Sequence, residues 1–243
     1  MSKSIEVKNS TTTKVRVWDL PVRIFHWSLV ILFGFSFYSG KTGGFELMDY
    51  HMLSGYTLLT LAVFRIFWGF LGGRHARFSS FIASPARIIG YLRSLVGKDH
   101  ATTIGHNPAG GLSVMVMLML LLGQGVTGLF TNDDIMLEGP LTHLVSYETS
   151  RSLTGTHETI SWLLAAAVSL HILAILYYLV VKKENLVKSM ITGFIQIEGT
   201  HEQSPEKVKI TSDGNSIEGT LWFRGALVLG VCAGFTYWII NYL

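Results

Sequence analysis

Two histidines frame an apolar stretch in the second half of the sequence, HETISWLLAAAVSLH at residues 157–171. On a helix, His157 and His171 would lie roughly 21 Å apart along the axis and roughly 40° apart around it, so both would face one side. Imidazole binds metals, carries protons and forms hydrogen bonds, and among apolar helices it needs a partner. The spacing therefore predicts two separate sites along one helix face.

The elements that carry these histidines are long apolar runs. The chain has 243 residues, of which 49% are hydrophobic and only 14% charged, and its mean hydropathy is +0.41. A bilayer is spanned by about 20 apolar residues. Five runs reach that length: 21–39, 51–71, 112–130, 156–181 and 221–243. The sequence therefore predicts an all-α integral membrane protein, and it contains no motif for binding nucleic acid.

Lysine and arginine are distributed unevenly between the loops. The segments 1–23, 72–111 and 182–220 hold five Lys or Arg each, whereas the loops 40–50 and 131–155 hold only Lys41 and Arg151. Basic residues accumulate on the cytoplasmic side of a membrane. We therefore expect the N-terminus inside and, after five crossings, the C-terminus outside.

Two further histidines lie at matching depths in the predicted helices. His26 is near the inner start of the first helix, at the depth of His171, and His51 is at the outer start of the second, at the depth of His157. The four histidines therefore form two predicted pairs. Two imidazoles across an apolar slot suit the axial positions of a b-type haem. Two such haems would carry electrons across the bilayer.

Other uses of these histidines are open at this point. Zinc usually takes four ligands with Cys or carboxylate among them, which the pairs lack, and a proton relay would need acidic residues at mid-membrane depth. A lone histidine can also form hydrogen bonds between helices. Gly34 and Gly55 would admit a porphyrin face or allow close helix packing. A haem-free membrane anchor or an ion or proton transporter is the corresponding alternative function.

The remaining segments predict little independent structure. SPARIIGYLRSLVG at residues 84–97 indicates a short helix on the inner membrane surface or an ordinary amphipathic loop helix. Residues 1–14 are expected to be disordered, and Cys232 to be a small packing residue. We expect a haem-binding transmembrane domain over 1–195, a cytoplasmic linker over 196–220 and a C-terminal transmembrane helix over 221–243.

Several motifs resemble the bacterial cytochrome b561 superfamily. They are DLPVRIF before His26, HMLSGYTLLTLAVFRIFWGF from His51, GHNPAGG at 105–111 and HETISWLLAAAVSLH, and the likeness covers about residues 15–195. Within the superfamily the chain resembles the b-type cytochrome subunit of nickel–iron hydrogenases, and it is also similar to the membrane cytochrome of formate dehydrogenase and to stand-alone quinol-linked cytochromes. The resemblance implies a four-helix haem-binding bundle in the bacterial inner membrane, and the fifth helix goes beyond that pattern.

The resemblance also implies electron exchange with the quinone pool, usually at the inner haem. GHNPAGG would lie near that haem, where His106 and Asn107 could bond a quinone carbonyl and Gly110 would let the ring come close. The same residues could instead form a simple helix-start turn. Basic candidates for pairing with haem propionates are Arg65, Arg74 and Arg77, and the excess of basic residues on the inner side explains these arginines equally well.

We therefore expect a di-haem b-type cytochrome, an electron-transfer subunit with two haem b groups as cofactors and membrane lipid around it. It would connect quinone or quinol with a periplasmic hydrogenase or c-type cytochrome. Acidic residues of the outer loops offer a docking face for that partner: Glu46, Asp49, Asp133, Asp134, Glu138 and Glu148. The alternative is a stand-alone quinol-linked oxidoreductase that reacts with a small oxidant such as superoxide.

Overall fold

Five long apolar helices dominate the structure. The computed structural model of the chain describes residues 11–95, 105–135, 137–199 and 214–243. Within these residues, five helices are long and apolar enough to cross a membrane. They are α1 (Leu20–Thr42), α2 (Phe45–Leu71), α5 (Pro108–Gly128), α6 (Tyr147–Tyr177) and α8 (Gly214–Tyr242). This confirms the predicted all-α membrane fold and all five predicted helices.

Two of these helices begin with the same local device. The Asp19 side chain accepts a hydrogen bond from the backbone N–H of Val22 at 2.9 Å, and the Asn107 side chain accepts one from the backbone N–H of Gly110 at 2.7 Å. In both helices a proline follows in the first turn. Such a cap gives a hydrogen-bond acceptor to a backbone N–H that has no partner within the helix. Proline suits the first turn because it has no backbone N–H that needs an acceptor. These caps mark the starts of α1 at Leu20 and of α5 at Pro108.

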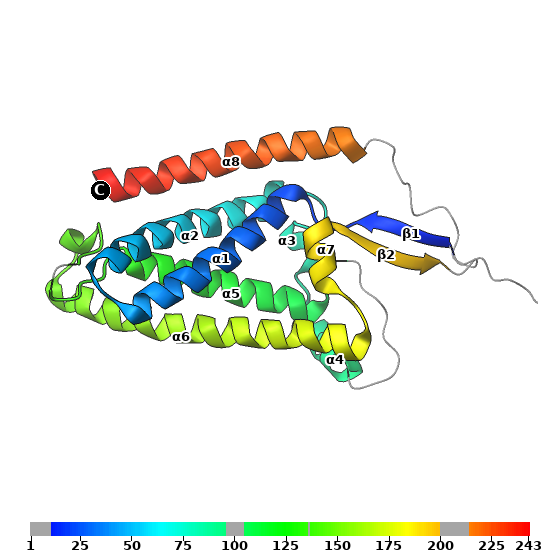
Figure 1. Cartoon of the computed structure of the whole chain (residues 1–243), viewed down its shortest axis with the longest axis horizontal. Helices are drawn as coiled ribbons and strands as arrows, with labels where there is room; N and C mark the ends of the chain where they lie inside the picture. The colour runs from blue at the N-terminus through cyan, green and yellow to red at the C-terminus, as the bar shows by residue number, and fades with distance from the viewer. Residues whose placement is uncertain (1–10, 96–104, 136, 200–213) are drawn as a thin grey trace, which may run out of the picture.

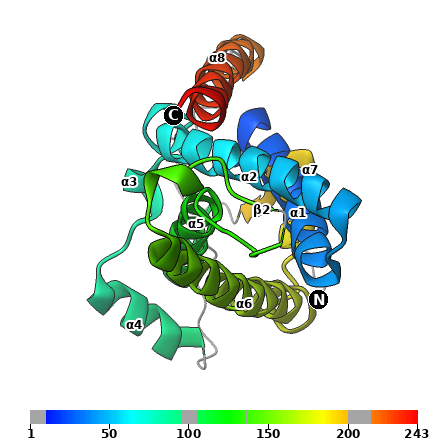
Figure 2. The ribbon, with the colours of Figure 1, turned by 90° about the vertical axis from the view of Figure 1, so that its left-hand side faces the viewer.

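Four of the long helices form a bundle and the fifth lies against its outside. α1 packs on α2, α2 on α5, and α5 on α6 (Figure 2). α1 contacts α6 through side chains, since the rings of Phe37 and Trp162 have centroids 5.6 Å apart. α8 lies along α2 and contacts α1 (Figure 1). α6 ends in a π-helical turn, η2 (Tyr178–Lys182). α2 therefore packs against α1, α5 and α8.

Several short elements gather at the end of the bundle where α1 begins (Figure 1), which we call the inner end. They are α3 (Phe78–Phe81), α4 (Pro85–Leu95), α7 (Leu186–Thr192), β1 (Thr11–Arg16) and β2 (Phe194–Gly199). α4 is the short helix that the sequence predicts between residues 84 and 97. The other end of the bundle, which holds the 3₁₀ turn η1 (Thr142–Leu144), is the outer end.

The two strands were not expected from the sequence. They pair antiparallel, with Thr11 opposite Gly199 and Arg16 opposite Phe194. The expectation of disorder was therefore wrong for residues 11–14, because their partner lies some 180 positions later in the chain. β2 and the early start of α8 also take up part of the segment 196–220, and residues 200–213 of that segment lie outside the described residues.

A tryptophan joins three of the long helices near the inner end. Trp68 of α2 is fully buried and stacks on Phe64, with 5.6 Å between ring centroids. It belongs to a cluster with Val22 of α1 and Cys232 of α8, so Cys232 packs as expected. Removing a buried side chain of this size costs about 3–5 kcal/mol, so this cluster anchors α8 to the bundle.

Candidate functional site

The structure brings two of the four histidines close together at the outer end, with their rings nearly perpendicular. His51 of α2 and His157 of α6 have ring centroids 6.2 Å apart, and their planes meet at 83°. Metal–imidazole bonds are about 2 Å long, so a single metal ion fits between two rings at this separation. The two residues are 106 positions apart, and topology and helical spacing predicted this pairing.

The hydrogen bonds of these two rings define which nitrogen carries the proton. The Nδ1 atom of His51 lies 2.9 Å from the backbone oxygen of Ser36, and that of His157 lies 2.9 Å from the backbone oxygen of Gln124. A carbonyl oxygen only accepts, so each Nδ1 donates. Each Nε2 is therefore the unprotonated nitrogen that carries the lone pair. The Gln124 side-chain amide donates to the Nε2 of His157 at 3.0 Å, which uses the same lone pair that would bind a metal.

The other two histidines lie together toward the inner end. His26 of α1 and His171 of α6 are close enough for their charges to interact. The Nδ1 atom of His26 is buried and has no hydrogen-bond partner among the described residues. The ring of His26 lies edge-on to Trp27, with 5.2 Å between centroids. The second predicted pair therefore lies within range of an electrostatic interaction, and among the described residues the Nδ1 atom of His26 has no carbonyl contact like that of the outer pair.

A third histidine accompanies the inner pair. His106, just before α5, lies between the rings of Trp18 and Phe81, with centroid distances of 4.7 and 4.5 Å. Burial, and then the positive charge of Arg65, lower the pKa of His106 to about 3. The ring is therefore neutral at physiological pH. Its Nδ1 atom is buried with no hydrogen-bond partner in the described part of the chain.

Asn107 and Gly110 form the start of α5. The Asn107 side-chain oxygen accepts from the backbone N–H of Gly110, and its amide donates to the Tyr178 hydroxyl at 2.9 Å. A Cβ atom on Gly110 would lie 3.2 Å from the Asn107 oxygen. Both polar ends of Asn107 are therefore engaged within the protein. The amide has a second N–H, so a ligand can accept a hydrogen bond from Asn107 beside Tyr178 or in its place.

Arg65 is the most buried cation near the inner pair. It is 4% exposed and donates from one terminal nitrogen to the backbone oxygen of Ala76 at 3.0 Å. Its other terminal nitrogen is buried without a partner among the described residues. An incompletely paired buried charge is costly, so this guanidinium is suited to an anionic group that is not part of the chain. By contrast, Arg77 donates from Nε to the backbone oxygen of Gly72 at 2.9 Å.

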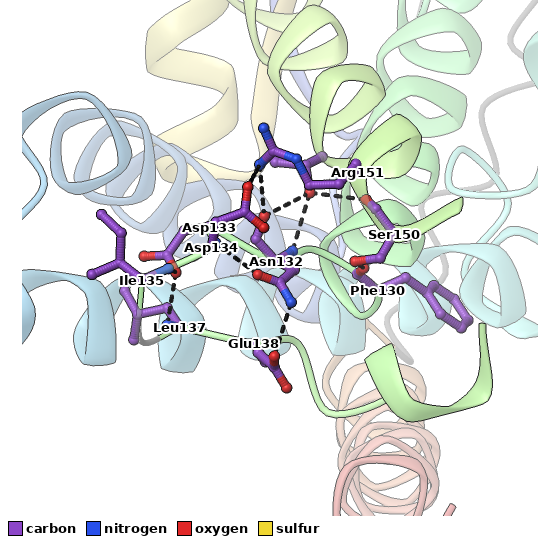
Figure 3. Close-up of polar contacts among 10 residues, drawn as sticks. Phe130, Asn132, Asp133, Asp134, Ile135, Leu137, Glu138, Ser150 and Arg151 are labelled. Carbon is purple, nitrogen blue, oxygen red and sulfur yellow. Dashed lines mark hydrogen bonds and ion pairs between the residues drawn. The ribbon is translucent and has the colours of Figure 1, made fainter. Parts of the chain in front are cut away.

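The outer loop between α5 and α6 is folded by its own acidic residues (Figure 3). Asp134 pairs with Arg151 at 3.0 Å, and Glu138 accepts from the Asn132 amide at 2.8 Å. Asp133 accepts from two backbone N–H groups later in the loop, each at 2.9 Å. Three of the acidic residues expected to dock a partner therefore hold the loop in shape. Glu46, Asp49 and Glu148 are exposed at the same end.

The donor set limits the kind of metal site. Among the described residues, no group of three or more His, Cys, Asp and Glu could hold a metal ion. The available sites are pairs of imidazoles, which do not complete a tetrahedral zinc site. Two imidazoles do complete the coordination of an iron whose other positions are filled by a porphyrin. The histidine pairs, together with the unpaired nitrogen of Arg65 for a carboxylate, therefore fit a haem.

Sequence reasoning missed four residues that contact the outer pair. Ser36 and Gln124 supply the carbonyl oxygens, and Gly40 and Gly128 lie directly against the imidazoles of His51 and His157. By contrast, a Cβ atom on Gly34 or Gly55, the two glycines singled out from the sequence, would meet nothing within 4 Å. A pattern in the sequence could have found the glycines, because a hydroxyl residue followed by glycine occurs near the end of both α1 and α5.

Comparison with known proteins identifies a family for this chain. The sequence profile of the prokaryotic cytochrome b561 family matches residues 17–193, which include all four histidines but not α8. The chain is similar to the probable Ni/Fe-hydrogenase B-type cytochrome subunit of Azotobacter chroococcum mcd 1, with 23% identity over 80% of this chain and 95% of that protein. It is also similar to the corresponding subunit of Rhizobium leguminosarum bv. viciae, with 24% identity over 74% of this chain and 87% of the relative. The probable Ni/Fe-hydrogenase 1 B-type cytochrome subunit of Escherichia coli K12 is 23% identical, over 78% of this chain and 94% of that protein. No solved structure matches the chain.

Proposed function

The chain belongs to the prokaryotic cytochrome b561 family, and from this premise we propose that it is a di-haem cytochrome that transfers electrons between the quinone pool and a periplasmic redox partner. Membrane electron transfer by haem b follows from the family itself. The number of haems, the quinone and the partner are the proposal.

The outer pair of imidazoles carries the proposal. The ring centroids of His51 and His157 lie 6.2 Å apart, and in both rings Nδ1 donates to a backbone carbonyl, which leaves Nε2 as the acceptor nitrogen. An iron bound at His157 would replace the Gln124 amide that donates to this Nε2. We assign these two residues to one haem and His26 with His171 to the second. A haem held in this way gains and loses one electron. The chain's own part is to hold two such groups at two depths of one bundle, since His157 and His171 lie on the same face of α6.

We propose that quinone binds at the inner end, around His106. This residue is neutral, buried and next to the inner histidine pair, and its Nδ1 atom has no partner among the described residues. A neutral imidazole has one N–H donor and one acceptor nitrogen, so His106 can donate a hydrogen bond to the quinone oxygen that gains a proton on reduction. Asn107 and Gly110 would border the same site, with the Asn107 amide donating to the quinone beside Tyr178 or in its place.

The orientation proposed here is an N-terminus in the cytoplasm and a C-terminus in the periplasm. The strong excess of Lys and Arg in the segments 1–23, 72–111 and 182–220 supports it. The outer end then faces the periplasm, where Glu46, Asp49 and Glu148 are exposed. The names of the relatives favour a hydrogenase as the partner, and a c-type cytochrome would suit the same acidic surface.

One measurement tests the central proposal. A reduced-minus-oxidised absorption spectrum of the purified protein, combined with a pyridine haemochrome assay, counts the b haems per chain. We expect two. One haem would remove one of the histidine pairs from the proposal, and a colourless protein would contradict the electron-transfer function.

A further inference from the structure

In both halves of the bundle, the imidazole of the outer pair rests on a glycine of the preceding long helix. A Cβ atom on Gly40 of α1 would lie 2.8 Å from the Cε1 atom of His51. A Cβ atom on Gly128 of α5 would lie 3.0 Å from the Cε1 atom of His157. The distance at Gly40 is shorter than real Cβ atoms show, and the distance at Gly128 is tighter than nine in ten real Cβ contacts, so an alanine at either position requires the ring to shift.

The glycine exposes the carbonyl that the ring contacts. The carbonyl oxygens of Ser36 and Gln124 lie four residues before Gly40 and Gly128, respectively. In an α-helix, such a carbonyl already accepts the N–H of the fourth residue after it, and the side chain of that residue covers the turn below. Glycine has no side chain there, so the second lone pair of the oxygen is open to the Nδ1–H of the histidine.

A hydroxyl residue precedes each glycine and completes the contact. The Ser39 oxygen lies 3.3 Å from the Nδ1 atom of His51, and the Thr127 oxygen lies 3.3 Å from that of His157. The Ser39 hydroxyl donates to the same carbonyl as the ring, at 3.1 Å. The Thr127 hydroxyl also lies 3.1 Å from the carbonyl oxygen that its ring contacts, and it lies closer, at 2.7 Å, to the backbone oxygen of Gly123. The two segments read SFYSG and QGVTG, so they share a hydroxyl residue and a glycine at their last two positions.

We propose that the segments 36–40 and 124–128 are two equivalent positioning segments for the outer axial imidazoles. They fix the tautomer and the plane of His51 and His157, and they make both rings stronger donors. This inference rests on the proposed function, because it assigns the role of these segments to a haem held by that pair. A hydrogen bond from the distal ring nitrogen raises the basicity of a ligand imidazole. A more basic ligand favours oxidised iron, so both segments lower the reduction potential of the outer haem.

The inner pair lacks such a segment on its α1 side. The Nδ1 atom of His26 is buried with no partner among the described residues, and a Cβ atom on Gly34, further along α1, would meet nothing within 4 Å. Changes in the two positioning segments are therefore expected to act on one haem only, and the inner haem is an internal reference in the same protein.

The test is a redox titration of the purified protein and of Gly40→Ala and Gly128→Ala, followed by absorption and by electron paramagnetic resonance. The outer haem is identified as the component that His157→Ala lacks. In both alanine variants we expect its midpoint potential to shift in the positive direction and its resonance to change, while the inner component stays in place. Gly155→Ala is the matched control, because Gly155 is in α6 close to His157 and a Cβ atom there meets nothing within 4 Å. Unchanged potentials in both alanine variants would overturn the inference.

A second pair of variants adds no atoms beside the rings. Ser39→Ala and Thr127→Val remove only the hydroxyls, and we expect a smaller positive shift of the same component. If the glycine variants do not fold, the absence of any shift in both hydroxyl variants overturns the inference. A wild-type protein without haem instead contradicts the proposed function, so the two failures are distinguishable.

Discussion

The indole Nε1–H of Trp68 lies 3.3 Å from each carboxylate oxygen of Asp19, a residue 49 positions earlier in the chain. The same carboxylate caps α1 through the N–H of Val22 and accepts the N–H of Gly73 at 3.1 Å. One buried side chain therefore connects the start of α1, the end of α2 and the turn that follows α2.

Replacing Asp19 is expected to weaken the inner end of the bundle. Asp19→Ala removes a helix cap and leaves the indole and two backbone N–H groups without their acceptor, at a cost of about 2–4 kcal/mol. Thermal unfolding in detergent, followed by circular dichroism, measures the loss as a lower melting temperature. Asp49→Ala, at an exposed position, is the control. Equal melting temperatures for Asp19→Ala and the wild type would show that this carboxylate is dispensable.

The two histidines of α6 are expected to hold one haem each. His157→Ala should lose the outer haem only and His171→Ala the inner one only, because each imidazole faces a different partner helix at a different depth. A pyridine haemochrome count gives one haem per chain in each variant. His143→Ala, in the outer loop, should retain both haems. Loss of both haems from either single variant while the fold is intact would contradict the pairing.

Arg65 is expected to raise the potential of the inner haem. A buried positive charge stabilises the reduced state, so Arg65→Met should lower that potential by tens of millivolts, on the order of 1 kcal/mol. Arg65→Lys keeps the charge and should restore most of the difference. A redox titration resolves both changes. A potential that is the same in Arg65→Met and the wild type would place the guanidinium away from the haem.

Asn107 has a cap role and a proposed quinone role, and two variants separate them. Asn107→Asp keeps the oxygen that accepts from Gly110 but loses the amide that donates to Tyr178, so stability should persist while quinol reduces the haems more slowly. Asn107→Ala loses both the capping oxygen and the amide, so its free energy of unfolding should fall by about 1 kcal/mol more than that of Asn107→Asp. Stopped-flow reduction by a short-chain quinol reads the rate. Wild-type rates in both variants would remove Asn107 from the quinone site.

The sequence predicted features that depend on local pattern and periodicity. Apolar runs of sufficient length gave the five helices, Ser84 and Pro85 gave the start of α4, and the fourteen-residue spacing in α6 gave a common face for His157 and His171. The encounter of His51 with His157 also followed, because helix direction and depth are set once the order of crossings is known.

Features that depend on contacts between distant segments could not be predicted in this way. Nothing near Thr11 shows that its strand partner is Gly199. The acids of the outer loop looked free, but the turn at Asp134 and its contact with Arg151 form only when the loop folds. The role of Gly40 becomes visible only when the ring of His51 is placed against it, since an isolated glycine in a helix also suits plain packing.

The pairing of β1 with β2 has a consequence for the order of events during synthesis. β1 precedes the first long helix and β2 follows the fourth, so the 177 residues between Arg16 and Phe194 must be made before the two strands can meet. At about 5–20 residues per second this takes on the order of ten seconds or more. β2 leaves the ribosome only after α1, α2, α5 and α6, which precede it in the chain. The inner sheet can therefore form only after all four helices that carry the histidines, or pack against them, have been made.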